Sequence, residues 1–216
     1  IEALEGALHS AAYGARVRAV EALGSIHHPR SRQVLLQALK SPDAAVAIAA
    51  LDAISNQGGA DAAEAVLPML RHANSGVRVA AIESLSRLGA ESAVPFIQTL
   101  LEDSNWDVRR AAAEALGRFR DPRAVGSLTR ALQDGDADVR EAGAMALGNL
   151  SDRQAIGPLV LALKDPHSGV RRIASGALAR IDPEWNRSPE AEAVVEQLKA
   201  SMDDADSGAR YFVEQL

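Results

Sequence analysis

The strongest constraint on this chain is a repeat of 31 residues that runs through most of its length. A pair made of Ala or Val and, in five of six cases, Arg begins at positions 15, 46, 77, 108, 139 and 170. A constant period of about 20 to 50 residues is typical of solenoids, in which each repeat packs only against its neighbours. We therefore predict one continuous array of stacked repeats.

Each repeat is predicted to contain two helices, which we call helix A and helix B. In one repeat, Asp121 and Pro122 form a typical helix start, and apolar residues follow at spacings of three and four up to Leu132. After a short turn the same spacing resumes from Val139 to Leu150. Only 3% of the residues are aromatic, and small aliphatic side chains suit closely stacked helices. The predicted fold class is all-α, an α-solenoid (alpha-alpha superhelix) of about seven helix-turn-helix repeats.

Several columns of helix B keep their chemistry in every repeat and are predicted to form the core. We count from the first residue of the repeated pair. Position +8 is always Leu or Ile, and positions +4 and +7 are always Ala, Gly or Ser. Small residues allow helices to approach closely, while the larger column fills the space between repeats. The +8 column holds Leu23, Ile54, Leu85, Leu116, Leu147 and Leu178.

The register breaks near the end of the chain. Ala209-Arg210 follows the previous repeated pair by 39 residues, so eight residues are inserted, and the insertion maps best to 182–189. We therefore divide the chain into regular repeats over 1–181, an inserted loop over 182–189, and a partial last repeat over 190–216. Neither end carries the polar cap of a terminal repeat, so we expect a segment of a longer array.

An acidic residue precedes the repeated Arg by six positions in four repeats, across the turn between helices A and B. In the second repeat both members are replaced, by Ser41 and Ala47. Since a lone, partly buried charge is costly, this joint loss indicates two side chains that satisfy each other. We interpret them as a structural ladder of pairs: Asp103 with Arg109, Asp134 with Arg140, Asp165 with Arg171, and Asp204 with Arg210.

The segments DSNWDVRRAAAEALGRFRDPRAVGSLTRALQD and DGDADVREAGAMALGNLSDRQAIGPLVLALKD resemble HEAT repeats. The spaced Asp and Arg, the Val-Arg pair and the Ala-Leu-Gly triplet stand at the positions expected for the short bacterial and archaeal type, named after phycobilisome-lyase subunits. The resemblance extends over essentially the whole chain and implies the α-solenoid fold. It does not specify a function, because such repeats occur in lyases, hydroxylases, chaperone-like factors and scaffolds.

No catalytic, cofactor-binding or metal-binding residue is predicted. The chain has no cysteine, no Gly-rich phosphate loop and no recognisable Ser-His-Asp group. It also lacks the His-Glu dipeptides that bind iron in deoxyhypusine hydroxylase, a HEAT-repeat enzyme, and the pair His27-His28 is interpreted as exposed turn residues. We therefore expect a protein that is not an enzyme and needs no cofactor.

The net charge of −6 argues against general affinity for nucleic acid, which requires many cations to neutralise phosphates. No apolar run is long enough to span a membrane. With no signal peptide visible, we expect a cytoplasmic location.

Positions +2, +6 and +10 of helix B fall outside the core columns and are predicted to face a partner on the concave side. We define an apolar row, which is Val17, Ile48 and Val79, and an acidic row, which is Glu21, Asp52, Glu83 and Glu114. A basic group follows in later repeats and consists of Arg110, Arg118, Arg172 and Arg180. Two acid–base pairs spaced by four residues, Glu83 with Arg87 and Glu114 with Arg118, are expected on this face.

Two aromatic residues, Tyr13 and Trp106, share one position at the start of helix B. Exposed aromatic side chains are frequent interface anchors, so both are candidate partner-binding residues.

The sequence thus favours a non-catalytic scaffold that binds a protein or peptide on its concave face. One alternative is a bilin lyase-like or other enzyme subunit built on HEAT repeats. A second alternative is a HEAT-like protein that binds nucleic acid, which the acidic composition disfavours.

Overall fold

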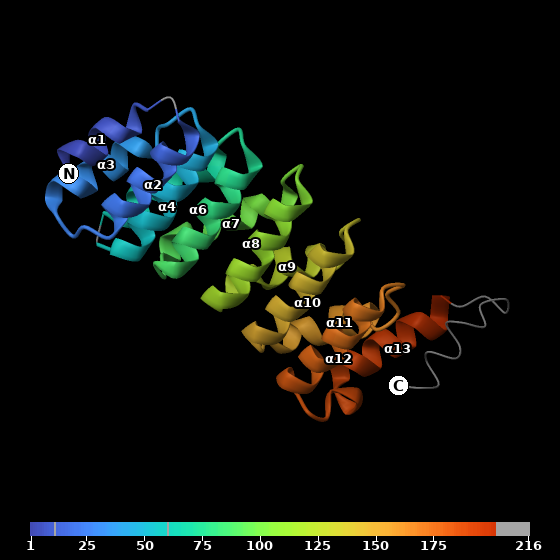
Figure 1. Ribbon diagram of the computed structural model, residues 1–216. Helices are drawn as coiled ribbons and strands as arrows, with labels where there is room; N and C mark the ends of the chain where they lie inside the picture. The colour runs from blue at the N-terminus through green and yellow to red at the C-terminus, as the bar shows by residue number, and fades with distance from the viewer. Residues whose placement is uncertain (11, 60, 202–216) are drawn as a thin grey trace. The chain divides into compact units, whose positions relative to one another are not determined.

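The computed structural model describes residues 1–10, 12–59 and 61–201, and these residues form only α-helices, short 3-10 helices and connecting turns (Figure 1). The predicted all-helical class and the predicted two helices per repeat are confirmed. Helix B of successive repeats is α2 (Tyr13–Gly24), α4 (Ala44–Gln57), α6 (Ser75–Arg87), α8 (Trp106–Phe119), α10 (Ala137–Leu150) and α12 (Ser168–Ile181).

Helix A is shorter and is interrupted in the middle repeats. The helices in this layer include α1 (Glu2–Leu8), α3 (Pro29–Ala38), α5 (Ala62–Val66), α7 (Val94–Thr99), α9 (Val125–Ala131), α11 (Ile156–Ala162) and α13 (Pro189–Ser201). Short 3-10 helices directly precede or follow some of them: η1 (Leu67–Arg71), η2 (Glu91–Ala93), η3 (Leu100–Glu102), η4 (Pro122–Ala124) and η5 (Arg153–Ala155). Pro68 and Pro95 lie in the first turn of η1 and α7, where a missing N–H group costs no helix hydrogen bond.

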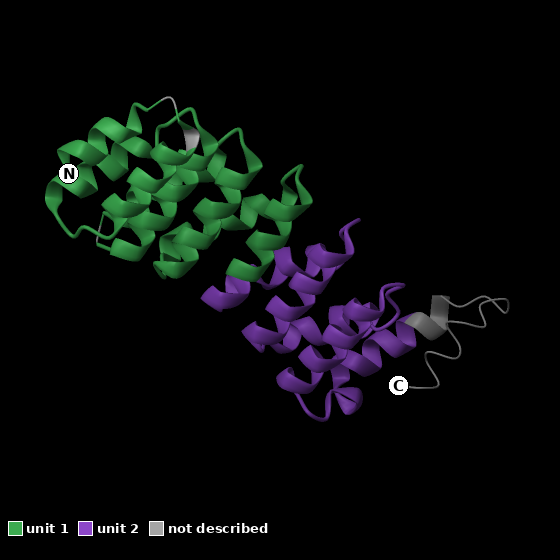
Figure 2. Ribbon diagram, viewed as in Figure 1, with its two compact units in different colours: residues 1–115 green, residues 116–216 purple. Residues whose placement is uncertain are grey.

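The chain divides into two compact units, unit 1 over residues 1–115 and unit 2 over residues 116–216 (Figure 2). In unit 1, α2, α4 and α6 pack side by side in chain order, and α3 packs against α2 and α4. In unit 2, α10 packs directly against α12, while α9 packs on α10 and α11 on α12. Each unit is therefore a two-layer stack with helix B in one layer and helix A in the other.

The predicted core columns are buried. All six residues of the +8 column have no solvent-exposed surface, and the +4 column is buried throughout. In the +7 column Ala53, Ser84, Ala115, Ala146 and Ala177 are buried, whereas Ala22 is half-buried. The segment 182–189, expected as an inserted loop, connects α12 to α13, contains the 3-10 helix η6 (Trp185–Arg187) and ends at Pro189, the first residue of α13.

Adjacent B helices make their closest contact where a glycine of one helix meets an alanine of the next. A Cβ atom added to Gly148 would lie 2.7 Å from the Cβ atom of Ala177, and one added to Gly117 would lie 2.8 Å from the Cα atom of Ala146. Real Cβ atoms do not approach neighbours this closely, so both positions require glycine for its missing side chain. The glycine of the Ala-Leu-Gly triplet thus allows the close approach of α2 to α4, α8 to α10 and α10 to α12, whereas Ser55 and Ser86 stand at this position of α4 and α6.

The ladder arginines connect adjacent repeats. Arg140 bonds Asp165, which lies 25 residues further along the chain. It donates from Nε to Asp165 Oδ2 at 2.7 Å and from Nη2 to Asp165 Oδ1 at 3.0 Å. Its Nη1 donates backward to the main-chain oxygen of Asp134 at 2.9 Å. Arg78 bonds Asp103 in the same forward direction at 2.7 Å. One guanidinium group therefore holds the turns of two successive repeats together.

The pairing that we expected within one repeat is wrong in its direction. The Asp103 carboxylate accepts from Arg78 of the preceding repeat, whereas Arg109 donates to the main-chain oxygen of Asp103 at 2.9 Å. The arginine near the start of helix B therefore donates to the main-chain oxygen of the Asp in its own repeat, because the carboxylate of that Asp accepts from the arginine of the preceding repeat. The expected pair of Asp204 and Arg210 lies outside the described residues.

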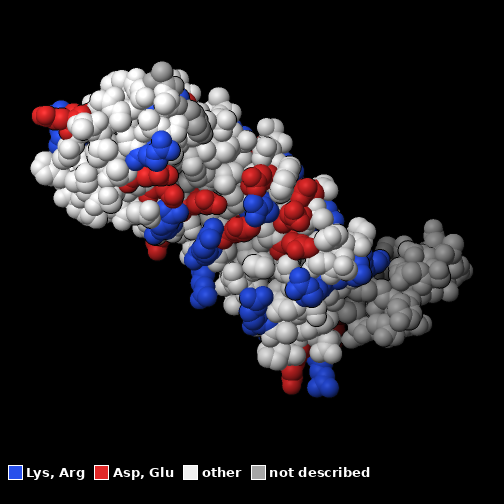
Figure 3. Space-filling model, in the orientation of Figure 1, with Lys and Arg blue, Asp and Glu red and all other residues white. Residues whose placement is uncertain are grey.

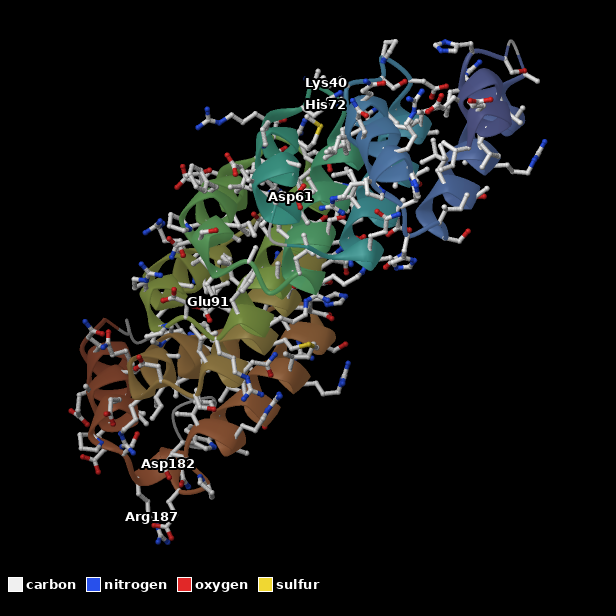
Figure 4. All side chains as sticks on the ribbon, turned by 90° about the vertical axis from the view of Figure 1, so that its left-hand side faces the viewer. Lys40, Asp61, His72, Glu91, Asp182 and Arg187 are labelled. Atoms are coloured by element: carbon white, nitrogen blue, oxygen red, sulfur yellow. The ribbon has the colours of Figure 1, made fainter. Side chains whose placement is uncertain are left out.

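The direction of the ladder also changes the explanation of the lost pair. Ala47 occupies the position of the ladder arginine, and His72, labelled in Figure 4, occupies the position of the Asp that would accept from this arginine in the next repeat. These two replacements belong together. Arg16 keeps an acceptor although Ser41 replaces the usual acid, because it bonds Asp43 at 2.7 Å.

The hydrogen bond from Arg140 lowers the pKa of Asp165 below its ordinary value, and the N–H group of His167 adds to this shift. Both side chains of the pair are largely buried, with 13% of Arg140 and 8% of Asp165 exposed. The charged pair is therefore shielded from water, unlike most surface ion pairs.

Replacing Gly148 by Ala should lower the free energy of unfolding by about 1–3 kcal/mol, because the added methyl group overlaps Ala177. Urea denaturation followed by circular dichroism measures the change. Gly126→Ala is the matched control, since nothing lies within 4 Å of its added Cβ atom, and it should be neutral or stabilising. Equal effects of the two substitutions would contradict the assigned contact.

Replacing Asp165 by Asn should cost about 2 kcal/mol or more at neutral pH, because the Arg140 guanidinium group stays largely buried without its counter-charge. The pKa of Asp165 is lower in the folded than in the unfolded state, where it is near 3.8. Its contribution is therefore complete above that pH and is lost as the pH falls through the folded-state pKa. The difference between wild type and variant in urea should shrink below about pH 4.

Asp138→Asn is the control for this substitution, because Asp138 is exposed and makes no ion pair among the described residues. It should change stability by less than about 0.5 kcal/mol. A cost for Asp165→Asn that does not depend on pH would argue against the ion pair.

Candidate functional site

The apolar row crosses the first three B helices of unit 1. Val17 lies on α2, Ile48 on α4 and Val79 on α6, each at the same position of its helix. The expectation that this row is exposed is wrong, because all three side chains are half-buried. The Cδ1 atom of Ile48 leans toward the start of α6, 3.6 Å from where a Cβ atom on Gly76 would lie. The row is therefore a partly covered ridge.

Small residues border the apolar row on both sides along α4 and α6. Ala45 and Gly76 lie one turn before Ile48 and Val79 on the same helix face, and Ala49 and Ala80 directly follow the two row residues in the sequence. All of them are half-buried, and none carries a charge: Ala45, Ala49, Gly76 and Ala80. Together with Ile48 and Val79 they form an uncharged, shallow surface over two helices.

The acidic row runs beside this surface. Glu21, Asp52 and Glu83 are exposed and Glu114 is half-buried. Asp52 accepts from Arg87 at 2.8 Å. Glu21 and Glu83 make no ion pair or side-chain hydrogen bond among the described residues, so their charges remain available. Figure 3 shows charged side chains of both signs gathered in a band on one face of unit 1.

Both acid–base pairs that we expected at a spacing of four residues are wrong. Arg87 turns away from Glu83 and donates to Asp52, and also to Ser55 Oγ at 2.6 Å, in the preceding repeat. Glu114 pairs with Arg110 at 2.9 Å. Arg87 thereby gains acceptors in the preceding repeat, whereas Arg118 makes no ion pair among the described residues.

Trp106 starts α8 and leaves 44% of its surface exposed. The guanidinium carbon of Arg110 lies 5.9 Å from the centre of the Trp106 ring, within the range of a cation–π contact. Asp107 bonds Arg110 at 2.6 Å and raises its pKa further. Arg110 is therefore held in place and charge-balanced. Tyr13 begins α2, and its side chain lies outside the described part of the structure.

The remaining predicted arginines belong to unit 2. Arg118, at the end of α8, and Arg172 and Arg180, on α12, are all exposed. Met145 on α10 stands at the position that the acidic row occupies in unit 1, and 45% of its surface is exposed. This part of the B-helix layer is therefore basic and apolar rather than acidic.

One surface feature was missed at the sequence level. Phe96 on α7 is 45% exposed and borders a hollow of about 400 Å³ in unit 1, which Leu67, Pro68 and Leu100 also line. Phe96 lies on α7 between the 3-10 helices η2 and η3 and directly follows Pro95.

The histidine pair lies in the turn before α3, where both residues are exposed, as predicted. Nδ1 of His28 accepts from the N–H group of Arg30 at 3.1 Å and caps the helix. Among residues 1–10, 12–59 and 61–201, no group of three metal-ligand side chains converges. No described helix is long and apolar enough to cross a membrane.

Several solved structures share the fold at low sequence identity. The Escherichia coli protein YibA has a TM-score of 0.67 at 16% identity, covering 100% of this chain and 92% of its own. An engineered protein has a TM-score of 0.58 at 20% identity, covering 84% of this chain and 98% of its own.

The complex of CpcE and CpcF of phycocyanin lyase from Nostoc sp. PCC7120 has a TM-score of 0.47 at 23% identity, covering 93% of this chain and 82% of its own. That likeness is too distant to bear on the function of this chain. No curated protein matches the sequence significantly.

The family comparison is more direct. The model for HEAT repeats matches residues 1–86, 64–148 and 127–215. Because these matches together extend over nearly the whole sequence, the chain belongs to the HEAT repeat family.

Proposed function

We propose that this protein is a non-catalytic scaffold and that the B-helix face of unit 1 binds a polypeptide partner. The observation that carries the proposal is the apolar row on α2, α4 and α6 beside a row of carboxylates. Extended apolar surface bordered by polar residues is typical of protein-binding sites.

The surface over α4 and α6 suits contact with side chains of a partner. The small residues beside Ile48 and Val79 allow a partner to approach the helix backbone closely. The half-buried state of the row means that these side chains are already held by their neighbours, so little side-chain entropy is lost on binding.

The charges favour a partner that is both apolar and basic. Glu21 and Glu83 make no ion pair among the described residues, so a lysine or arginine of a partner could form one at either position. Such pairs at the rim of an interface mainly set orientation and the rate of association. We therefore propose a segment with apolar residues flanked by Lys or Arg.

Changing both Ile48 and Val79 to Asp should abolish capture of the partner, because the apolar contact is replaced by charge. Immobilised wild type and variant are incubated with cell extract, and retained proteins are identified by mass spectrometry. Circular dichroism checks that the half-buried substitutions leave the fold intact.

Phe96→Asp is the matched control, since Phe96 is an exposed apolar residue on the other layer of unit 1. It should retain the proteins that the wild type retains. If Ile48→Asp with Val79→Asp keeps them and Phe96→Asp loses them, the binding face is the helix A layer and the proposal is wrong.

Changing Glu21 and Glu83 to Gln should weaken binding of the captured protein by up to about tenfold at low salt, and less at about 1 M salt, where charges are screened within about 3 Å. Titration of that protein at two salt concentrations measures the effect. Glu64→Gln, on the helix A layer, serves as the control for loss of one exposed acid. Loss of affinity that is independent of salt would show that the carboxylates act only by packing.

A further inference from the structure

The B-helix layer of unit 2 carries exposed arginines that no carboxylate balances. Arg118 and Arg172 make no ion pair or side-chain hydrogen bond among the described residues. Arg180 donates from Nη1 to the amide oxygen of Asn149 at 3.1 Å and from Nε to the main-chain oxygen of Gly176 at 3.4 Å. Both acceptors of Arg180 are neutral, so its charge is oriented without being neutralised.

Asn149 links the two sides of this group. Its Nδ2 atom lies 3.5 Å from where a Cβ atom on Gly117 would be, which places the amide next to the end of α8, the helix that carries Arg118. Its Oδ1 atom accepts from Arg180 on α12. The close approach of the helices at Gly117 and Gly148 thus brings positive charge from α8 and α12 to either side of α10.

The helix between α8 and α12 in the chain, α10, carries an exposed apolar side chain. Met145 lies one turn before Asn149 on α10 and exposes 45% of its surface. On α12, Gly176 occupies the same position as Met145 does on α10, and nothing lies within 4 Å of its added Cβ atom. A flexible thioether beside an open position can adapt to an apolar side chain of a partner.

The carboxylates of α10 make no ion pair with these arginines among the described residues. Glu141 lies one turn before Met145 and accepts from Nδ1 of His167 at 3.0 Å. Asp138 lies at the start of α10, nearly two turns before Met145, with the partial positive charge of the helix N-terminus beside it. The surface around Met145 therefore keeps an excess of positive charge.

We propose that Met145, Arg118 and Arg180 form a second docking site, which takes an acidic segment of a partner polypeptide with an apolar side chain at its centre. Its charge is complementary to such a segment: Arg presents a planar set of donors that matches a carboxylate in two bonds. An exposed Met at the centre favours a polypeptide, which can supply an apolar side chain, over a nucleic acid, whose backbone presents charged phosphates and polar sugars. This site lies on unit 2 and does not depend on the apolar row of unit 1.

The test uses the whole chain and a short fluorescein-labelled peptide with Leu and Glu at helical spacing, followed by fluorescence anisotropy. The wild type should bind this peptide, and a peptide with Gln in place of Glu should bind more weakly. Changing Arg118 and Arg180 together to Glu should weaken binding at least about tenfold, and Met145→Ser should weaken it several-fold.

Arg187→Glu is the control, because it makes the same type of substitution at one exposed residue of η6, between α12 and α13 (Figure 4). It should leave peptide binding unchanged, and circular dichroism of each variant confirms its helix content. The proposal fails if the wild type does not bind the Glu peptide, or if the double Arg variant binds as well as Arg187→Glu does. It also fails if a single-stranded oligonucleotide binds more tightly than the peptide and depends on the same arginines.

Discussion

Close contact through small residues where neighbouring B helices meet is the constraint on which the rest of the structure depends. It places Gly117 against Ala146 and Gly148 against Ala177 with no space for one more methyl group. At this distance the Leu column fills the remaining space completely, since every member of it is buried. The same distance fixes how far apart equivalent surface residues of successive repeats stand, and therefore which residues can form rows.

The arginine bridges stabilise the array at the turns, where apolar packing ends. A guanidinium group has enough donors to bond a carbonyl of its own repeat and a carboxylate of the next, as Arg140 does. Lysine has one ammonium group and could not hold both acceptors in the same way. Partial burial of these pairs makes them sensitive to the loss of one member, which explains why Ala47 and His72 occur together.

The fold could be predicted from the sequence because the 31-residue period and the spacing of apolar residues agree in every repeat. The direction of the ladder could not. In a periodic chain, a spacing of six residues within a repeat implies an equally regular spacing of 25 residues to the next repeat. The same Asp and Arg positions fit both spacings, so the sequence does not distinguish them. The structure shows that Arg78 bonds Asp103 of the next repeat.

The same ambiguity explains the errors on the surface. Arg87 is as regularly spaced from Asp52 of the preceding repeat as from Glu83 of its own helix, and it bonds Asp52. The position of Ile48 predicted an outward side chain, but the short side chains at the start of α6 leave room for it to lean inward. Phe96 is exposed on α7, where two 3-10 helices break the regular α-helical spacing that a periodicity argument assumes.

The central claim is that the B-helix face of unit 1 binds a polypeptide through its apolar row. The most direct test places a photo-crosslinking amino acid at Val79 in one protein and at Phe96 in another, and irradiates each in cell extract. Crosslinked products should form from Val79, compete with unlabelled wild type, and be absent or fewer from Phe96. Products that form only from Phe96 would contradict the claim and place the partner on the helix A layer.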